Sequence, residues 1–306
     1  MKDLAVLLMA YGAPSSEDEI EAYLTDIGGG QKPNPNMVHR LRERYRKIGG
    51  KSPLLDITAA QASALGRALK SQGVDAPVYF AMRHWHPYAK EVVPRILDSY
   101  CHKILALALT PHYSEISTGG YKQALERSLE GMHEVEIDFV DSWYDNPIFH
   151  QAVAEKITSA PKQSQGTPKA QIIFTAHSLP ERILQCNDPY PKQLEVSCQA
   201  VGDLLKINDW LFAYQSAGHT TEKWLGPSIL EVLEKLSIGT GRRRDILIVP
   251  IGFVADHLEI LYDIDVEARE FAKNHGLNLM RTESLNTSPT FVSALADVIK
   301  RRVCGS

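Results

Sequence analysis

The chain has 306 residues, of which 44% are hydrophobic and 23% charged, enough for two globular domains with substantial cores. Its net charge of -4 argues against nucleic acid as a partner, and no apolar run approaches the ~18 residues of a transmembrane helix. The four cysteines form no CxxC pair, which favours reduced thiols in a cytoplasmic protein, and their wide, irregular spacing argues against an iron–sulfur cluster.

Short apolar runs separated by helical patterns predict β-strands. In chain order the runs cover residues 4–9, 78–82, 104–109, 135–140, 171–176, 210–214, 246–251 and 277–281. The first run superficially resembles a signal peptide, but its apolar core is very short, and we interpret it as a buried strand. Short apolar strands that alternate with helices are typical of parallel sheets covered on both faces.

Several helices have recognisable ends. One is expected to begin near Ser15 with an acidic first turn and to stop at the glycines 28–30. Others are expected over residues 36–48 and 56–71, each followed by glycine, which commonly ends a helix. Residues 290–303 predict a final amphipathic helix.

The strands fall into two sets of four, which suggests a duplication. Each set opens with a strand that ends in a polar ring and a nearby proline, with Tyr11 in the first half and His177 in the second. We predict an α/β fold of two similar Rossmann-like domains, each a doubly wound parallel four-stranded sheet, facing one another across a cleft. The domains are placed at 1–144 and 145–288, with a helix at 289–306 that packs back on the first. Neither GxGxxG nor a P-loop motif follows a strand, so nucleotide binding is not supported.

His177 is the first candidate for chemistry. It ends an apolar run, and in open α/β sheets ligands bind outside the carboxyl ends of the strands. An imidazole in that position can bind a metal or transfer a proton near neutral pH. The alternative is a histidine that only caps a turn through hydrogen bonds.

Glu259 follows another apolar strand, so it is expected to converge with His177 on one cleft, and it begins an acidic series with Asp263 and Glu267. Their spacing of i, i+4 and i+8 places all three on one face of a helix. One explanation is a solvated surface. The other is a route for protons or hydrated cations, in which partial burial raises the pKa of Glu259 and makes it a usable base.

Further candidates lie near other strand ends. Tyr11 follows the first strand and is either a core ring or a metal ligand. Arg44 and Tyr45 belong to a basic helix, which is either a solvated face or a clamp for carboxylates. His84 and Tyr121 follow the second and third strands and add polar rings there.

These stretches, taken together and in this order, resemble the ferrochelatase family over essentially the whole chain. The matching segments are Met9-Ala10-Tyr11-Gly12-Ala13-Pro14, Tyr45 to Pro53, Ala176-His177-Ser178-Leu179-Pro180, Asp188-Pro189-Tyr190, Gln215-Ser216, Trp224-Leu225-Gly226-Pro227 and Gly252-Phe253-Val254-Ala255-Asp256-His257-Leu258-Glu259. The resemblance implies chelatase-type domains around a porphyrin cleft. The length and the Tyr-Gly pair of the first segment are similar to the soluble bacterial branch that metallates coproporphyrin III.

The resemblance implies a lyase of heme biosynthesis that inserts ferrous iron into a porphyrin, most like coproporphyrin III, to give coproheme. It implies that His177 and Glu259 bind the incoming metal and accept pyrrole protons, with Tyr11 on the opposite porphyrin face as a ligand of iron in the product. Asp263 and Glu267 match an acidic ladder beside the metal. Positions that match contacts of the propionates, the macrocycle edge or the outer end of the cleft are Arg44, Tyr45, Ser52, Tyr121 and His84.

Alternatives remain at this point. Gly28 and Gly29 stand where some similar enzymes carry arginine, which removes one propionate clamp and leaves protoporphyrin IX open as the substrate. A chelatase for another divalent metal and tetrapyrrole is a second alternative, because His/carboxylate sites accept several ions. A heme carrier with Tyr11 as axial ligand is a third. We expect a monomer that needs no cofactor, takes porphyrin and ferrous iron as substrates, and has a downstream heme-pathway enzyme as a partner.

Overall fold

The computed structural model describes residues 3–132, 135–160, 170–218, 221–238 and 245–305. The chain divides into two compact units. Unit 1 comprises Met1–Phe149 and Asn286–Ser306, and unit 2 comprises His150–Leu285. The C-terminal helix therefore belongs to the same unit as the N-terminal strand. None of the described helices combines the length and the apolar character that crossing a membrane requires.

Unit 1 is built on a parallel four-stranded sheet with the strand order β2-β1-β3-β4. The strands are β1 (Leu4–Ala10), β2 (Val78–Met82), β3 (Lys103–Ala108) and β4 (Glu136–Val140). The central strand β1 is buried along almost its whole length, because both of its faces are covered. Its apolar sequence, without polar alternation, is the pattern of such a strand.

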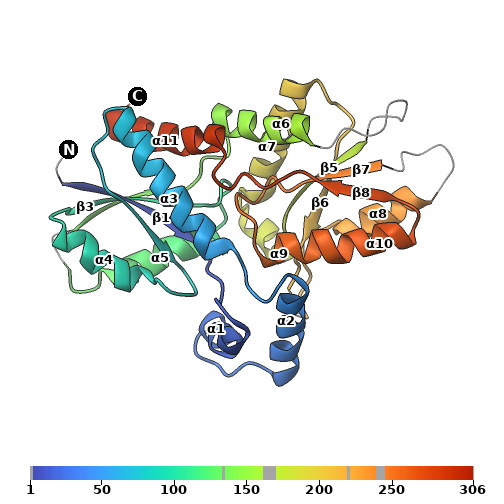
Figure 1. Ribbon diagram of the computed structural model, residues 1–306, viewed down its shortest axis with the longest axis horizontal. Helices are drawn as coiled ribbons and strands as arrows, with labels where there is room; N and C mark the ends of the chain where they lie inside the picture. Colours follow the sequence, from blue (N-terminus) through green and yellow to red (C-terminus); the bar gives the residue numbers. More distant parts are fainter. Residues whose placement is uncertain (1–2, 133–134, 161–169, 219–220, 239–244, 306) are drawn as a thin grey trace. The chain divides into compact units, whose positions relative to one another are not determined.

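Helices cover both faces of this sheet. One face carries α3 (Leu54–Ser71) and α11 (Pro289–Cys304), which pack on each other (Figure 1). The other face packs against α4 (Ala89–Asp98) and α5 (Thr118–Ser128). The helices predicted over 56–71 and 290–303 are thus confirmed, and their apolar faces form the core of unit 1.

An insertion of short helices separates β1 from α3. It contains η1 (Glu17–Glu19), α1 (Ile20–Ile27) and α2 (Pro35–Lys47). Helix α2 begins where the side chain of Asn34 accepts a hydrogen bond from the amide of Asn36 at 2.9 Å, with a proline in the first turn. The helices predicted in this region are confirmed, and α1 stops at the predicted glycines.

Unit 2 repeats the same topology with the strand order β6-β5-β7-β8, again all parallel. Its strands are β5 (Gln171–His177), β6 (Leu211–Gln215), β7 (Asp245–Val249) and β8 (Asn278–Arg281). Helix α6 (Pro147–Ser159) begins in unit 1 and continues into unit 2. All the predicted strands are confirmed to within two residues at each end, and so is the prediction of two doubly wound parallel sheets.

One face of the second sheet packs against a continuous apolar cluster from the helices that follow β6 and β7. These helices are α8 (Ile229–Ser237), α9 (Leu258–Leu261), the π-helix η3 (Asp263–Ala268) and α10 (Arg269–Asn274). Ile173 points to this face, so the neighbouring Phe174 points to the opposite one, where Trp210 packs edge-on against its ring. Two further elements, η2 (Glu181–Cys186) and α7 (Tyr190–Leu205), follow β5.

The strand orders place a topological switch point in each sheet. In unit 2 the chain leaves β5 toward β6 on one side and later returns to β7 on the other side. In open α/β sheets, ligand sites lie at such a switch point, here at the carboxyl ends of the neighbouring strands β5 and β7. His177 ends β5, and the segment that leads to Glu259 follows β7.

Candidate functional site

A glycine allows the segment after β7 to lie against the end of β5. A Cβ atom on Gly252 would come within 2.5 Å of the Cβ of Ala176 and 2.8 Å of its Cα, a distance that no side chain tolerates. The amide of Gly252 donates to the carbonyl of Thr175 at 3.1 Å. This close approach carries the chain past His177 and into the short helix α9, which bears Glu259.

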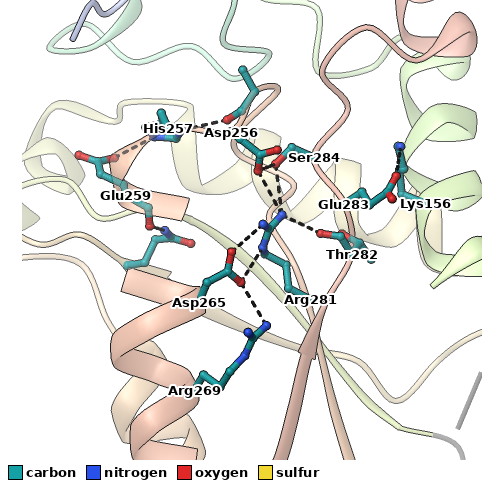
Figure 2. Close-up of polar contacts among 12 residues, drawn as sticks. Lys156, Asp256, His257, Glu259, Asp265, Arg269, Arg281, Thr282, Glu283 and Ser284 are labelled. Carbon is teal, nitrogen blue, oxygen red and sulfur yellow. Dashed lines mark hydrogen bonds and ion pairs between the residues drawn. The ribbon is translucent and has the colours of Figure 1, made fainter. Parts of the chain in front are cut away.

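Glu259 lies between two imidazoles. Its Oε1 is 3.4 Å from Nε2 of His177. Its Oε2 is 3.5 Å from Nε2 of His257, a contact that Figure 2 shows. The side chains of His177 and Glu259 are 32% and 31% exposed, so the pair is recessed but open to a ligand. The structure therefore brings together the two residues that the sequence placed at converging strand ends, and it adds a second histidine.

Hydrogen bonds to backbone carbonyls fix the tautomer of both rings. Nδ1 of His177 bonds to the carbonyl of Ser178, and Nδ1 of His257 to the carbonyl of Ala255 at 2.9 Å. Because a carbonyl can only accept, each Nδ1 carries a proton and each Nε2 is the atom that faces Glu259. Histidines that bind metals commonly donate their second ring nitrogen in this way.

Tyr190 supports the turn that carries His177. Its hydroxyl donates to the backbone carbonyl of His177 at 2.9 Å, and Asp188 accepts from the amide of Tyr190 at 3.0 Å. Burial raises the pKa of Tyr190 above its ordinary range, so the hydroxyl remains a donor at physiological pH. The conformation of the segment 177–190 is thus set by contacts that leave Nε2 of His177 accessible.

The charges of the pair differ from the sequence-based expectation. Burial by itself raises the pKa of Glu259, but the charges of His177 and His257 and their hydrogen bonds outweigh burial and lower it well below its usual range. Burial lowers the pKa of His177, whereas the charge of Glu259 and the hydrogen bonds with Glu259 and Ser178 raise it overall. The expectation of a raised Glu259 pKa was wrong, because it considered burial alone and not the two imidazoles beside the carboxylate.

The acidic series does not lie on a regular α-helix. Helix α9 ends after one turn and gives way to the π-helix η3, where the amide of Glu267 donates to the carbonyl of Tyr262 five residues earlier at 2.9 Å. The prediction of one regular helix through Glu259, Asp263 and Glu267 was therefore wrong. Asp263 is buried and accepts a hydrogen bond from the hydroxyl of Ser216, while Glu267 is exposed.

In unit 1, Tyr11 follows β1 at the carboxyl edge of the sheet and is 41% exposed. Its ring centroid lies 4.8 Å from that of His84, whose Nδ1 is 2.9 Å from Oδ2 of Asp26. The hydroxyl of Tyr88 donates to Oδ1 of the same aspartate at 3.2 Å. Burial lowers the pKa of His84, and the hydrogen bond to Asp26 opposes that change. Two predicted residues thus stand side by side, with Asp26 orienting one of them.

The other predicted binding residues of unit 1 are less exposed. Tyr45 on α2 is 1% exposed, and the hydroxyl oxygen of Ser52 accepts from the amide of Leu54 at the start of α3, at 3.4 Å. Tyr121 is buried on α5 with the guanidinium of Arg83 5.6 Å from its ring centre. Arg44 is half-buried near the end of α2. All of these residues belong to unit 1, whereas His177, Glu259, Asp263 and Glu267 belong to unit 2.

Two observations concern metal binding by the protein alone. Among the residues that the structure describes, no group of three or more His, Cys, Asp or Glu side chains is close enough to hold a metal ion. The four cysteines are free thiols, with Cys101 and Cys198 buried and Cys186 and Cys304 exposed. Of the candidate metal ligands predicted from the sequence, His177 and Glu259 form a close pair, with 3.4 Å between Nε2 and Oε1.

A ferrochelatase family model matches residues 3–303. The chain belongs to the ferrochelatase family. It is 42% identical over 299 residues to a ferrochelatase from Herpetosiphon aurantiacus, covering 96% of this chain and 97% of that protein. It is 38% identical over 307 residues to the coproporphyrin III ferrochelatase of Geobacillus thermodenitrificans, covering 99% and 96%. The chain is accordingly an enzyme of heme biosynthesis that belongs to the metal chelatases.

Solved structures agree with the fold of this ferrochelatase-family chain. SirB from Bacillus subtilis, solved with Fe3+, matches with a TM-score of 0.61 at 12% identity and covers 98% of this chain and 95% of its own. CbiX, described as the terminal enzyme for biosynthesis of siroheme in denitrifying bacteria, matches with a TM-score of 0.55 at 14% identity, covering 97% and 98%. At such identities the likeness establishes the chelatase fold and nothing finer.

Several contacts of the pair in this ferrochelatase-family chain were not predicted. His257 precedes Glu259 by two residues after a strand end, so its position was a usable signal that we did not weigh. Gln215 donates from Nε2 to the carbonyl of Glu259 at 3.0 Å, and Ser216, with φ of 60°, reaches Asp263. A glutamine and a serine carry no sequence signal of such contacts, because the partners lie more than 40 residues away in the chain.

Proposed function

We propose that this enzyme inserts ferrous iron into coproporphyrin III and releases coproheme. The observation that carries the proposal is the recessed pair of His177 Nε2 and Glu259 Oε1 at the switch point of unit 2. Two further features support the choice of porphyrin. Relatives at 35–38% identity bear the name coproporphyrin III ferrochelatase, and tyrosine followed by glycine stands after the first strand.

The reaction needs groups that hold a cation and accept protons. Ferrous iron enters the macrocycle, bonds form between iron and the ring nitrogens, and two pyrrole N–H bonds lose their protons. Nε2 of His177 offers a lone pair when the ring is neutral, and the ionised carboxylate of Glu259 offers negative charge to the incoming Fe2+. Both groups can then accept the protons that leave the pyrroles.

The two groups also compete for protons. The charge of Glu259 raises the pKa of His177, so a larger fraction of His177 is protonated at a given pH than for an isolated histidine. Iron binding at Nε2 must displace that proton. His257, with its Nε2 beside the second carboxylate oxygen, keeps Glu259 ionised while this exchange takes place.

The remaining roles follow the family resemblance. Tyr11 is proposed as a ligand of iron in the product, and Arg44 and Ser52 as contacts of the porphyrin carboxylates. Asp263 and Glu267 are proposed to supply cations to the pair. Tyr45, Tyr121 and His84 are assigned to the macrocycle edge and the outer part of the porphyrin site. Iron is a substrate, and no resident cofactor enters the reaction.

The test is anaerobic turnover of the purified enzyme with ferrous iron, with coproporphyrin III and protoporphyrin IX offered separately and followed by absorbance. A higher kcat/KM for coproporphyrin III is expected. A preference for protoporphyrin IX would show that the proposed substrate is wrong. Turnover only with another metal or another tetrapyrrole would show that the proposed reaction is wrong. Tight binding of the iron porphyrin without any insertion would indicate a heme carrier.

The variant His177→Ala tests whether His177 is needed for metal insertion but not for porphyrin binding. The variant is expected to lose insertion while it still quenches porphyrin fluorescence on binding, because the imidazole holds the metal and not the macrocycle edge. His275→Ala is the matched control, since His275 stacks on Phe271 at the exposed end of α10 in the same unit. Normal turnover of His177→Ala would reduce His177 to a structural residue.

A further inference from the structure

Arg281 lies at the end of β8 and connects two separate segments of unit 2 (Figure 2). Its Nε is 3.0 Å from Oδ1 of Asp265 and its Nη2 is 2.7 Å from Oδ2, a bidentate pair. On its other side, Nη1 is 3.2 Å from Oδ1 of Asp256. Nη1 also donates to the carbonyl of Thr282 at 3.0 Å and contacts Ser284. One guanidinium therefore holds two carboxylates that are nine residues apart in the chain.

The two carboxylates flank the residues of the candidate site. Asp256 immediately precedes His257 and stands three residues before Glu259, and Asp265 belongs to η3, two residues after Asp263. The hydroxyl of Ser284 adds a hydrogen bond to Oδ1 of Asp256 at 2.7 Å. The segment 256–265 is thus fastened at both ends to the carboxyl end of β8.

The helix in this segment is short. Helix α9 is four residues long, and its N-cap residue His257 makes no side-chain capping hydrogen bond. A helix of one turn is not stable by itself, because the free-energy cost of nucleation exceeds the stabilisation from the hydrogen bonds of a single turn. Besides the Arg281 contacts, side chains of the strand end after β6 bond to this segment: Gln215 donates to the carbonyl of Glu259 at 3.0 Å, and the hydroxyl of Ser216 donates to Asp263. The orientation of Glu259 therefore depends on contacts from outside the helix.

The Arg281 contacts are also well shielded. The Arg281 side chain is 12% exposed, whereas Arg269, which approaches Asp265 at 3.4 Å, is 54% exposed. A planar guanidinium in a buried, bidentate arrangement resists rotation, whereas a surface ion pair does so weakly. This difference makes Arg281 the group that can transmit a fixed geometry from the sheet to the site.

We propose that Arg281 is a positioning residue for metal insertion, which sets the orientation of Glu259 and His257 by holding Asp256 and Asp265 together. This inference rests on the proposed function and extends it to a residue that touches neither iron nor porphyrin. It predicts an effect on the rate of insertion and on the environment of the two histidines, with porphyrin affinity left intact.

The primary test compares Arg281→Met and Arg281→Lys with the wild type in full-length protein. We expect Arg281→Met to lower kcat roughly 10–100-fold, as loss of a partner that orients a metal ligand does. The KM for porphyrin and the dissociation constant from fluorescence quenching should stay within about twofold. Arg281→Lys should recover part of the rate, because an ammonium can pair with one carboxylate but does not span both.

A second measurement does not depend on turnover. In protein with 13C-labelled histidine, the ring signals of His257 and His177 should shift in Arg281→Met, because Glu259 moves relative to both rings. If Arg281→Met fails to fold, Asp256→Asn serves instead, since it keeps the shape and removes the charge next to His257. The expected loss of kcat and shift of the signals are the same.

Arg269→Met is the matched control, because it removes a cation from Asp265 and leaves Asp256 untouched; it should retain the wild-type rate and spectrum. The proposal is overturned if Arg281→Met lowers only thermal stability, with kcat and both histidine spectra unchanged, or if Arg269→Met has an equal effect. Absence of iron insertion by the wild type would refute the proposed function instead, and the histidine spectra would still decide the role of Arg281.

Discussion

At the scale of single residues, Glu259 has an environment that keeps a recessed carboxylate charged. Two imidazole Nε2 atoms stand 3.4 and 3.5 Å from its two oxygens, and both rings are fixed by carbonyls that accept from Nδ1. A carboxylate with a raised pKa would be a stronger proton acceptor but a poorer partner for a cation. The observed arrangement favours attraction of the metal, and proton acceptance follows once the metal displaces the proton of His177.

Glu259→Gln tests this charge directly. Glutamine keeps the size and one carbonyl oxygen but can neither be ionised nor accept a proton, so we expect insertion to fall by roughly 10²–10⁴-fold, the usual worth of a general base. Porphyrin binding, followed by fluorescence quenching, should persist. Glu270→Gln on exposed α10 is the matched control and should behave as the wild type. Unchanged insertion in Glu259→Gln would remove this residue from the mechanism.

The pKa of His177 is a second residue-scale prediction. The charge and hydrogen bond of Glu259 raise this pKa above its ordinary 6.5, whereas burial lowers it. The titration midpoint of His177 should therefore drop in Glu259→Gln, because the charge that offsets burial is removed. Histidine ring signals followed by NMR against pH give the midpoint in both proteins. In the wild type, insertion should increase with pH through the His177 midpoint, because iron needs the neutral ring. An identical midpoint in both proteins would contradict the assigned pairing.

At the scale of elements, the π-helix explains why the acidic series could not be placed from its spacing. Residues 259, 263 and 267 fit an α-helical period, but the chain inserts a wider turn at η3. The apolar residues Ile260, Ile264 and Ala268 keep the same spacing as the acids and remain in the core cluster. The acidic and the apolar residues recur with the same spacing, so the sequence pattern does not indicate the change of helix type. The change is visible only in the backbone hydrogen bonds. π-turns within helices frequently occur at functional sites.

The contact between Gly252 and β5 provides an element-scale prediction. Gly252→Ala forces a Cβ to within 2.5 Å of Ala176 in a buried strand, so we expect a loss of roughly 1–3 kcal/mol in the free energy of unfolding, together with slower insertion. Gly66→Ala is the matched comparison. Its Cβ would meet Val78 at an ordinary 3.6 Å within α3, and it should add up to about 1 kcal/mol through helix propensity.

Urea unfolding of the two alanine variants decides between these expectations. If Gly252→Ala were as stable and as active as the wild type, the segment after β7 could shift without consequence, and the close approach would not be what positions α9. If Gly66→Ala were also destabilising, the difference between the two sites would not be steric.

At the scale of the whole molecule, the sequence predicted the strands, their grouping in fours and the meeting of two strand ends. These features depend on apolar runs and on the rules of parallel sheets, which a single sequence carries. The sequence did not predict Asp26 beside His84, Gln215 beside Glu259, or Arg281 between Asp256 and Asp265. Such contacts join residues that are far apart in the chain, and a polar residue gives no indication of which distant partner it meets.

The free energy of unfolding is a property of the whole molecule, and its dependence on pH should come in part from the His177–Glu259 pair. The folded pKa of His177 is raised above 6.5, so its contribution is complete below that pH and is lost as pH rises through the folded value. The folded pKa of Glu259 is lowered below 4.5, so its contribution is present above that pH and is lost as pH falls through the folded value. The pair should therefore stabilise the protein most between pH 4.5 and 6.5.

Urea unfolding of the wild type and Glu259→Gln at about pH 5.5 and about pH 9 measures this contribution. The difference in unfolding free energy between the two proteins should shift in favour of Glu259→Gln at the higher pH, because a neutral His177 leaves the recessed carboxylate without its positive partner. Glu270→Gln should show no such change with pH, since its carboxylate is exposed. A difference that stayed constant from about pH 5.5 to about pH 9 would mean that His177 and Glu259 do not titrate as a pair in the folded protein.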